Sequence, residues 1–304
     1  MKKNPAKKTR ATHGRKPLIG KLVVFGVGLI GGSFALALKK RRAVAHVVGV
    51  GRSRANLLAA RRLGVIDEIA TDPARAVKDA DLVLLAVPLG QTRAVLAQIA
   101  PHLAPHTIVS DAGSTKRDVI DSARRQLGAT FSRFVPAHPI AGTEKSGAAA
   151  AFPELFSGRN LILTPEAETS GSALKLVAAA WKTAGARVIT MDAAAHDRMF
   201  ALVSHLPHLL VFAAVCNIAD YPDAANLFQN TGGGFRDMTR IAGSSPEMWR
   251  DICVANRDAL LAALDGYLSD LEAMRGLLEA SDGAALEAKF AIARAARAKW
   301  LKPG

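Results

Sequence analysis

Histidines gather in the last third of the sequence. His205 and His208 lie three residues apart in the segment SHLPH, and His196 precedes the first of them by nine residues. A zinc site would require a third ligand and favours two histidines four residues apart on an unbroken helix. Pro207 interrupts helical hydrogen bonding, and neither an HExxH motif nor a cysteine cluster accompanies the pair. The pattern predicts no metal and leaves two interpretations open: imidazoles held by backbone groups at a kink, or groups that bind an anion or orient a substrate.

A second polar cluster follows a run of glycines. The segment Gln229–Arg240 (QNTGGGFRDMTR) ends one helical pattern and restarts with Arg236 and Arg240, four residues apart. Residues at this spacing share a helix face, and one guanidinium can donate two parallel hydrogen bonds to a carboxylate. The cluster therefore predicts that Arg240 binds the carboxylate of a small anionic molecule.

A glycine motif near the N-terminus predicts a dinucleotide site. The run Lys21–Phe25 predicts a strand, GVGLIG follows it, and Ser33–Leu38 has helical character. In this context the first glycine permits a tight turn, the second lets the backbone approach a pyrophosphate, and the third lets helix and strand pack closely. The first N–H groups of the helix then face the phosphates. The predicted cofactor-binding residues of this motif are Gly26, Val27, Gly28, Leu29, Ile30 and Gly31.

The end of the second predicted strand, His46–Val50, bears on the choice of dinucleotide. NAD-binding folds place an Asp or Glu there to bind the ribose 2′-OH. Here Gly51, Arg52 and Ser53 follow instead, and a guanidinium and a hydroxyl can both donate to a 2′-phosphate. We expect Arg52 and Ser53 to bind NADP, with NAD as the second candidate and an exposed basic loop as the alternative interpretation.

Three further apolar runs predict strands of a parallel sheet that is buried on both faces. They are Asp81–Val87, Thr107–Ser110 and Arg133–Pro136. Pro88 closes the first run and is a further predicted cofactor contact.

Polar loops follow the last two of these strands. Ser114 lies in DAGSTK, and His138 lies in HPIAGTEK. Ligands of open α/β sheets bind beyond the carboxyl ends of the strands, so we expect Ser114, His138, Arg52 and the glycine loop to converge on one crevice. His138, in a loop at that edge, is the candidate acid/base.

The remaining pattern predicts a second, all-helical domain. Asn160–Leu163 and Arg187–Thr190 predict two more strands around a helix near Ala173–Trp181, and apolar residues recur at helical spacing after Met191. The predicted fold class is α/β, a Rossmann-type dinucleotide-binding domain followed by an all-helical substrate domain. The predicted boundaries are a basic tail over 1–17, the nucleotide domain over 18–190 and the helical domain over 191–304.

Composition narrows the class of protein. The net charge is +14, and half of it comes from the first 17 residues, which hold seven Lys or Arg and no acid. Such a tail predicts a disordered, solubilising arm. No recognition motif supports a nucleic-acid role. Cys216 and Cys253 lie in apolar, helix-like segments without metal spacing, so we expect buried thiols in a reducing, cytoplasmic setting.

The segment 22–38 has the composition of a membrane-spanning helix because it contains only apolar residues, Gly and Ser. Its 17 residues fall short of the roughly 20 that a span needs. Its glycines also fit the dinucleotide motif, so we expect no membrane association.

The sequence resembles the prephenate/arogenate dehydrogenase family of tyrosine biosynthesis, from about residue 18 onward. The resemblance rests on GVGLIGGS, DAGSTK, HPIAGTEKSG, HDRMFALVSHLPH and GGGFRDMTRIA…MW. HPIAGTEKSG together with SHLPH is highly specific, whereas many dehydrogenases share the glycine loop. The chain departs from NAD-using members at Gly51, where they carry an Asp. This departure agrees with the preference for NADP expected from Arg52 and Ser53.

The resemblance implies a hydride transfer from prephenate to the nicotinamide with loss of the ring carboxylate as carbon dioxide. His138 matches the histidine that accepts the 4-hydroxyl proton, and Ser114 matches the serine that contacts that hydroxyl. Arg240 matches a carboxylate-binding arginine, and His208 matches a substrate-binding position.

The resemblance also assigns less central positions. Thr143 and Glu144 match a mobile part of the pocket, and Trp249 matches an aromatic residue near the substrate, although core packing would explain Trp249 equally well. His196 and His205 are expected to shape the hinge between the domains. A homodimer formed through the helical domain, with the active site in the crevice between domains, is implied as well.

Two other functions compete with this one. A hydroxyacid dehydrogenase would use a lysine at the start of the helical domain, but residues 191–215 contain none. A nucleotide-sensing protein that binds nucleic acid through the basic tail would not need Ser114, His138 and Arg240 together. Within the family, no acid in 229–234 is placed to pair with an ammonium. That weakly favours prephenate over arogenate, with dual use as the alternative.

Overall fold

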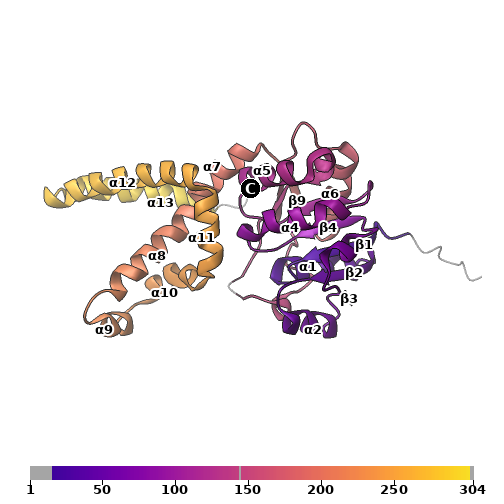
Figure 1. Cartoon of the computed structure of the whole chain (residues 1–304). Helices are drawn as coiled ribbons and strands as arrows, with labels where there is room; N and C mark the ends of the chain where they lie inside the picture. Colours follow the sequence, from indigo (N-terminus) through magenta and orange to yellow (C-terminus); the bar gives the residue numbers. More distant parts are fainter. Residues whose placement is uncertain (1–15, 144, 302–304) are drawn as a thin grey trace, which may run out of the picture. The chain divides into compact units, whose positions relative to one another are not determined.

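The computed structural model describes residues 16–143 and 145–301. The chain divides into two compact units, Met1–Ala194 and Ala195–Gly304, which are indigo to magenta and orange to yellow in Figure 1. The basic tail predicted over 1–17 lies outside the described residues except for its last two.

The first unit contains a six-stranded sheet whose pairings are all parallel. The strand order is β3-β2-β1-β4-β5-β6. The order reverses between β1 and β4, and this switch point is where open α/β sheets bind ligands. The strands are β1 (Ile19–Phe25), β2 (Val44–Val50), β3 (Glu68–Ile69), β4 (Leu82–Leu85), β5 (Ile108–Asp111) and β6 (Phe134–Val135).

The helices of this unit form two groups. α1 packs against α6, whereas α4 packs against α3 and α5. The aromatic core lies on the side of α1 and α6, where the Trp181 ring meets Phe34 at 4.3 Å and Phe156 at 5.0 Å. The helices are α1 (Leu29–Lys40), α2 (Arg54–Arg62), α3 (Pro73–Val77), α4 (Thr92–Ile99), α5 (Arg117–Leu127) and α6 (Gly171–Thr183).

The first unit also contains a three-stranded sheet that the sequence did not predict. β7 (Ala137–Pro139) pairs antiparallel with β8 (Asn160–Leu163), and β9 (Arg187–Thr190) pairs parallel with β8. The bounds of β8 and β9 are those predicted, but their sheet is not. Pro136 separates β6 from β7, and because it has no N–H it ends the first ladder.

The second unit is entirely helical over its described residues, as predicted. Its buried cluster is small: Ala201, Leu206, Leu260 and Ala263. The Pro207 kink takes the form of a π-helical segment, Ala201–His205, between two α-helices. The helices are α7 (Ala193–Phe200), α8 (Leu206–Ala219), α9 (Ala224–Gln229), α10 (Gly233–Thr239), α11 (Pro246–Ala255), α12 (Arg257–Glu279) and α13 (Gly283–Trp300).

By length and hydropathy, the helical stretch that could cross a membrane is not the segment 22–38. Residues 22–38 divide between β1 and α1, whereas Ala193–Ala219 is long and apolar enough to cross a membrane by composition alone. The expectation of buried thiols is wrong for Cys216, which is exposed. Cys216 lies on α8, which is apolar on most faces but has only Leu206 and Val211 buried within the chain.

Candidate active site

The glycine loop adopts the geometry that a dinucleotide needs. Gly26 has a φ of +88°, and a Cβ there would lie 2.2 Å from the Ala86 carbonyl oxygen. A Cβ on Gly31 would meet the Gly26 carbonyl oxygen at 2.4 Å, so this glycine allows α1 to pack closely on the turn. Nothing lies within 4 Å of the corresponding position at Gly28. The second glycine therefore leaves space for a ligand, whereas the first and third satisfy constraints of the fold.

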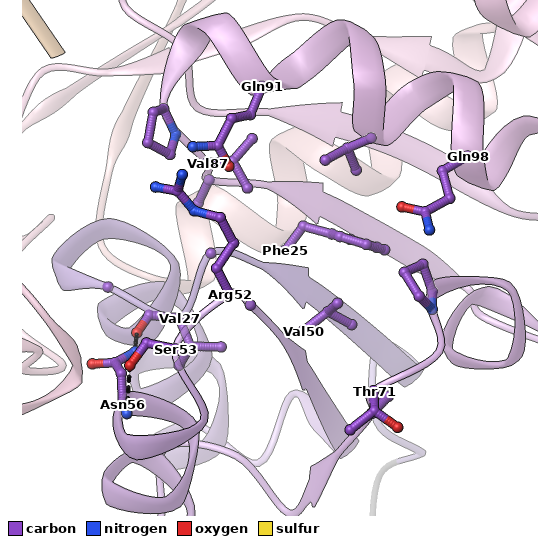
Figure 2. Close-up of a pocket in the computed structure, with 18 residues that line it drawn as sticks. Phe25, Val27, Val50, Arg52, Ser53, Asn56, Thr71, Val87, Gln91 and Gln98 are labelled. Atoms are coloured by element: carbon purple, nitrogen blue, oxygen red, sulfur yellow. Dashed lines mark hydrogen bonds between the residues drawn. The ribbon is translucent and has the colours of Figure 1, made fainter. Parts of the chain in front are cut away.

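A cavity of about 420 Å³ opens beside this loop, at the carboxyl ends of β1, β2 and β4. Figure 2 shows side chains from these three strand ends around it. Leu29, Ile30 and Gly31 form the first turn of α1 and do not line the cavity. The predicted residues that do line it are Gly26, Val27, Gly28, Arg52, Ser53 and Pro88.

Arg52 is held at the cavity by a residue that the sequence patterns did not indicate. The Gln91 amide, oriented with its oxygen toward Arg52, accepts hydrogen bonds from both terminal guanidinium nitrogens at 3.1 and 2.9 Å. Figure 2 shows the two side chains facing each other. Gln91 follows β4 in a short 3₁₀ turn, so it comes from a strand other than that of Arg52. No local spacing in the sequence relates the two.

Ser53 and Asn56 organise the start of α2. Ser53 is the N-cap of α2, and its Oγ accepts from the Asn56 backbone N–H at 3.2 Å. The Asn56 side chain donates to the Val27 carbonyl at 2.7 Å and accepts from the Ala148 N–H at 2.8 Å. One amide thus joins the glycine loop to the segment after HPIAGTEKSG. A cap interaction explains why Ser53 is present without reference to a ligand.

The structure places Ser114 and His138 on neighbouring segments. Ser114 lies, half-buried, in the loop between β5 and α5. His138 was expected in a loop, but it lies on β7 opposite Ile162 and is also half-buried. β5 and β7 are in contact. A strand restrains the imidazole more than a loop does because its backbone is hydrogen-bonded to β8.

The predicted mobile part of the pocket is only partly described. Thr143 is exposed, and its Oγ accepts from the Lys145 N–H at 3.2 Å. Glu144 lies outside the described residues. Thr143 does not line the cavity beside the glycine loop.

In the second unit, His208 stacks on Trp249 with ring centroids 3.6 Å apart and an interplanar angle of 19°. Trp249 is buried, and its indole N–H donates to the Ser244 hydroxyl at 3.0 Å. The packing interpretation of Trp249 is confirmed, and its ring also supports that of His208; a place near the substrate stays a prediction. Arg240 is exposed where α10 passes into a 3₁₀ turn.

The hydrogen bonds of His208 define its protonation. The Ser204 carbonyl, 2.9 Å from Nδ1, can only accept, so Nδ1 carries the proton. Burial lowers the pKa of His208, the positive charge of Arg240 lowers it further, and the bond to Ser204 opposes both. The ring is neutral at pH 7, so its Nε2 is an acceptor and not a cationic site for an anion.

The other two histidines lie in a buried network. His205 Nδ1 accepts from the Asn256 amide at 3.0 Å, and the same amide donates to the Asp197 carbonyl at 2.8 Å. His196 donates to the Asp197 carboxylate at 2.8 Å. Burial lowers the pKa of His205 to about 4; Asp197 opposes this effect, and His196 and His208 add to it. The network links the end of the π-helical segment to α7.

Three kinds of chemistry are available from these groups. The cavity and glycine loop can hold a dinucleotide, His138 can exchange a proton, and Arg240 can bind an anion. Within 16–143 and 145–301, no group of three or more His, Cys, Asp or Glu is arranged to hold a metal ion.

Comparison with known proteins identifies both units. Residues 34–190 match the nucleotide-binding domain of prephenate dehydrogenase, and residues 192–292 match its dimerization domain. The chain is 37% identical to the cyclohexadienyl dehydrogenase of Zymomonas mobilis, over 91% of this chain and 94% of that protein. It is 36% identical to the prephenate dehydrogenase of Bacillus subtilis, over 90% of this chain and 74% of that protein.

Solved structures agree with these similarities. The prephenate dehydrogenase of Aquifex aeolicus in complex with hydroxyphenyl propionate and NAD+ superposes with a TM-score of 0.87 at 34% identity, covering 92% of this chain and 98% of that one. Synechocystis arogenate dehydrogenase gives a TM-score of 0.76 at 29% identity, covering 92% of this chain and all of that one.

Proposed function

Because this chain belongs to the prephenate dehydrogenase family of NAD(P)-dependent oxidoreductases, we propose that it converts prephenate to 4-hydroxyphenylpyruvate. In this reaction a hydride leaves the ring carbon that bears the hydroxyl, and the bond to the ring carboxylate breaks to release carbon dioxide. The nicotinamide, when bound, supplies the hydride acceptor. One observation carries the proposal: the glycine loop and the Ser114 loop follow β1 and β5 at the same edge of one parallel sheet.

His138 and Ser114 act on the reacting hydroxyl. His138 in its neutral form accepts the hydroxyl proton as the hydride leaves, which prevents a positive charge from building on the oxygen. When carbon dioxide leaves, the electron pair of the broken bond enters the ring and the proton returns to the phenolate oxygen. Ser114 contacts the same hydroxyl and orients the imidazole. The strand position of His138 supports this role because a fixed base needs less reorganisation at the moment of reaction.

Arg240 and His208 hold the substrate by different interactions. Arg240 binds a carboxylate with charge-assisted hydrogen bonds. His208, neutral and with Nε2 as acceptor, binds a donor group of the substrate. Its stacking on Trp249 fixes the plane in which that donor must lie. Thr143, which is exposed, contributes a wall of the pocket.

Arogenate is the second candidate substrate, alone or together with prephenate. The similarity to a cyclohexadienyl dehydrogenase and to an arogenate dehydrogenase favours it, and so does the acceptor at His208, which suits an ammonium as well as a hydroxyl. The absence of an acid in 229–234 favours prephenate.

NADP is the favoured cofactor over NAD. Arg52, presented at the cavity by Gln91, provides a cation for a 2′-phosphate. At Gly51 an added Cβ would contact only Leu57, at 3.6 Å and beyond. A Cβ therefore fits there, so crowding at this atom does not exclude an acidic residue.

A homodimer formed through the second unit completes the proposal. Leucines at 261, 268, 271 and 278 lie exposed along α12, at spacings that place them on one side of the helix. A partner covering them would bury a stripe that this chain leaves in water. The match of residues 192–292 to a dimerization domain supports this arrangement.

The test is steady-state formation of reduced nicotinamide from prephenate and from arogenate, with NADP and NAD supplied in turn. We expect turnover with prephenate and a higher kcat/KM with NADP. Absence of turnover with either substrate would overturn the proposed reaction. Equal kcat/KM for the two dinucleotides would overturn only the cofactor preference.

A further inference from the structure

A buried ion pair closes the loop that carries Ser114. Lys116 has no exposed surface and Asp111 is 2% exposed, and the lysine ammonium donates to Asp111 Oδ2. Fully buried lysines are uncommon in proteins because removing the charge from water is costly. Ser114 lies between the two partners in sequence, so the pair fixes both ends of its loop.

The same two side chains also grip the residue before His138. Asp111 Oδ1 accepts from the Ala137 N–H at 2.9 Å, and Lys116 Nζ donates to the Ala137 carbonyl at 2.8 Å. Asp111 Oδ2 additionally accepts from the Gly113 N–H at 2.8 Å. Both backbone groups of Ala137 are therefore held by one ion pair.

These contacts connect two sheets that strand pairing leaves separate. β5 belongs to the six-stranded sheet, whereas β7 is an edge strand of the three-stranded sheet and pairs with β8 among the described strands. The side of β7 toward β5 is joined to it through Asp111 and Lys116. The β5–β6 ladder ends at Val135, so beyond that residue the position of His138 relative to Ser114 depends on these side chains.

We propose that Asp111 and Lys116 are positioning residues, which set the catalytic distance between Ser114 and His138. The inference rests on the proposed function, because it presumes that these two groups act on one hydroxyl. An ion pair that served only the fold would affect stability and not the rate of the reaction. Replacing a buried ion pair with neutral groups often leaves stability unchanged or raises it.

The primary test is Lys116→Met, compared with Lys39→Met. Lys39 also forms an ion pair in the first unit, with Asp67 at 2.6 Å, but this pair lies at the surface and away from β7. We expect Lys116→Met to lower the single-turnover rate of hydride transfer by about 100-fold, the scale of a 1 Å misplacement. NADPH binding, followed by nucleotide fluorescence, should change less than about threefold because the glycine loop is untouched. Lys39→Met should alter neither quantity.

Hydrogen exchange provides a readout that does not depend on turnover. In Lys116→Met the amides of a peptide spanning 134–142 should exchange faster, while those of β1 stay protected. Asp111→Asn should likewise reduce the protection of the amides in this peptide. Lys116→Arg keeps the charge with another geometry, so it should restore protection without restoring the rate of hydride transfer.

The outcomes distinguish a failure of the proposed function from a failure of the positioning role. A wild-type enzyme without turnover on prephenate or arogenate overturns the proposed function. A wild-type enzyme that turns over, together with a Lys116→Met variant that binds NADPH and keeps its rate within about threefold, overturns the positioning role. If the single variant does not fold, Asp111→Asn/Lys116→Met, which leaves no buried charge, decides in the same way.

Discussion

The two units hold their functional groups in different ways. In the first unit, backbone geometry and buried side chains fix the glycine loop, the Ser114 loop and His138. In the second unit, Arg240 is exposed, and the described buried cluster contains four residues while leucines along α12 remain in contact with water. The first unit thus holds its functional segments by its own buried contacts, whereas the second leaves apolar surface that a further molecule can cover. Substitutions in the first should therefore affect the reaction, and those in the second should affect binding and assembly.

The largest effect is expected for His138→Asn. Loss of the base should lower kcat by about 1,000-fold, within the usual range for general-base catalysis. Substrate affinity should stay within about threefold because Arg240 is intact. Steady-state kinetics and equilibrium binding of prephenate measure the two quantities. Near-normal turnover in this variant would refute the mechanism.

Arg240→Ala should affect KM much more than kcat, the reverse of His138→Asn. Losing charge-assisted hydrogen bonds to a carboxylate costs roughly 2–3 kcal/mol, which corresponds to an increase in KM of about 30- to 150-fold. The kcat should fall much less. Arg236→Ala, four residues away on the same exposed segment, is the matched control and should leave KM unchanged. A loss confined to kcat would contradict the assigned role.

Leu268→Glu tests whether a partner subunit covers the exposed leucines of α12. A carboxylate on the exposed stripe of α12 would be buried without a partner in the dimer, at a combined cost of about 2–3 kcal/mol or more for its two copies. Sedimentation equilibrium should show a dimer that dissociates at roughly 30-fold higher concentration or above. Leu58→Glu, at a leucine 51% exposed on α2 of the first unit, should leave the dimer intact. Unchanged association of the Leu268 variant would remove this helix from the interface.

The histidine network predicts a loss of stability in acid that originates in the second unit. The unfolded chain protonates His205 near pH 6.5, but the folded chain does so only near pH 4. Stability is therefore full above about pH 6.5 and falls as the pH drops toward 4, by about 2 kcal/mol between pH 7 and pH 5. Urea unfolding at both pH values should show a smaller loss for His205→Gln. Equal losses would mean that His205 does not drive the effect.

Gly51→Asp should have the smallest effect, and one limited to cofactor choice. The added carboxylate can bind a ribose 2′-OH and repels a 2′-phosphate. The ratio of kcat/KM for NADP to that for NAD should therefore fall by about tenfold or more, since each 1.4 kcal/mol is worth a factor of ten. Gln91→Ala should reduce the ratio through Arg52, whereas Gln98→Ala, at another lining residue, should not. If Gln91→Ala leaves the ratio unchanged, Arg52 does not take part in distinguishing the two dinucleotides.

Local patterns in the sequence determined the class of fold and the chemistry available to it. Glycine spacing after a strand predicted the dinucleotide loop, because a positive φ at Gly26 and a close approach at Gly31 exclude other residues. Apolar runs predicted the strands, and helical periodicity after Met191 predicted the all-helical unit. The motifs DAGSTK, HPIAGTEKSG and SHLPH together indicated the family. Each of these signals lies within a few residues of chain, where backbone sterics and burial act directly.

Only the tertiary structure decided how distant segments meet. It placed β7 in a second sheet, set Gln91 against Arg52, and joined the Ser114 loop to the residue before His138 through Asp111 and Lys116. It also exposed Cys216, because the surface around α8 depends on what covers the helix. These contacts link residues dozens of positions apart, and no local propensity encodes them. They follow from strand pairing and side-chain burial across the whole fold, which is why a motif identified His138 but not the residues that hold it.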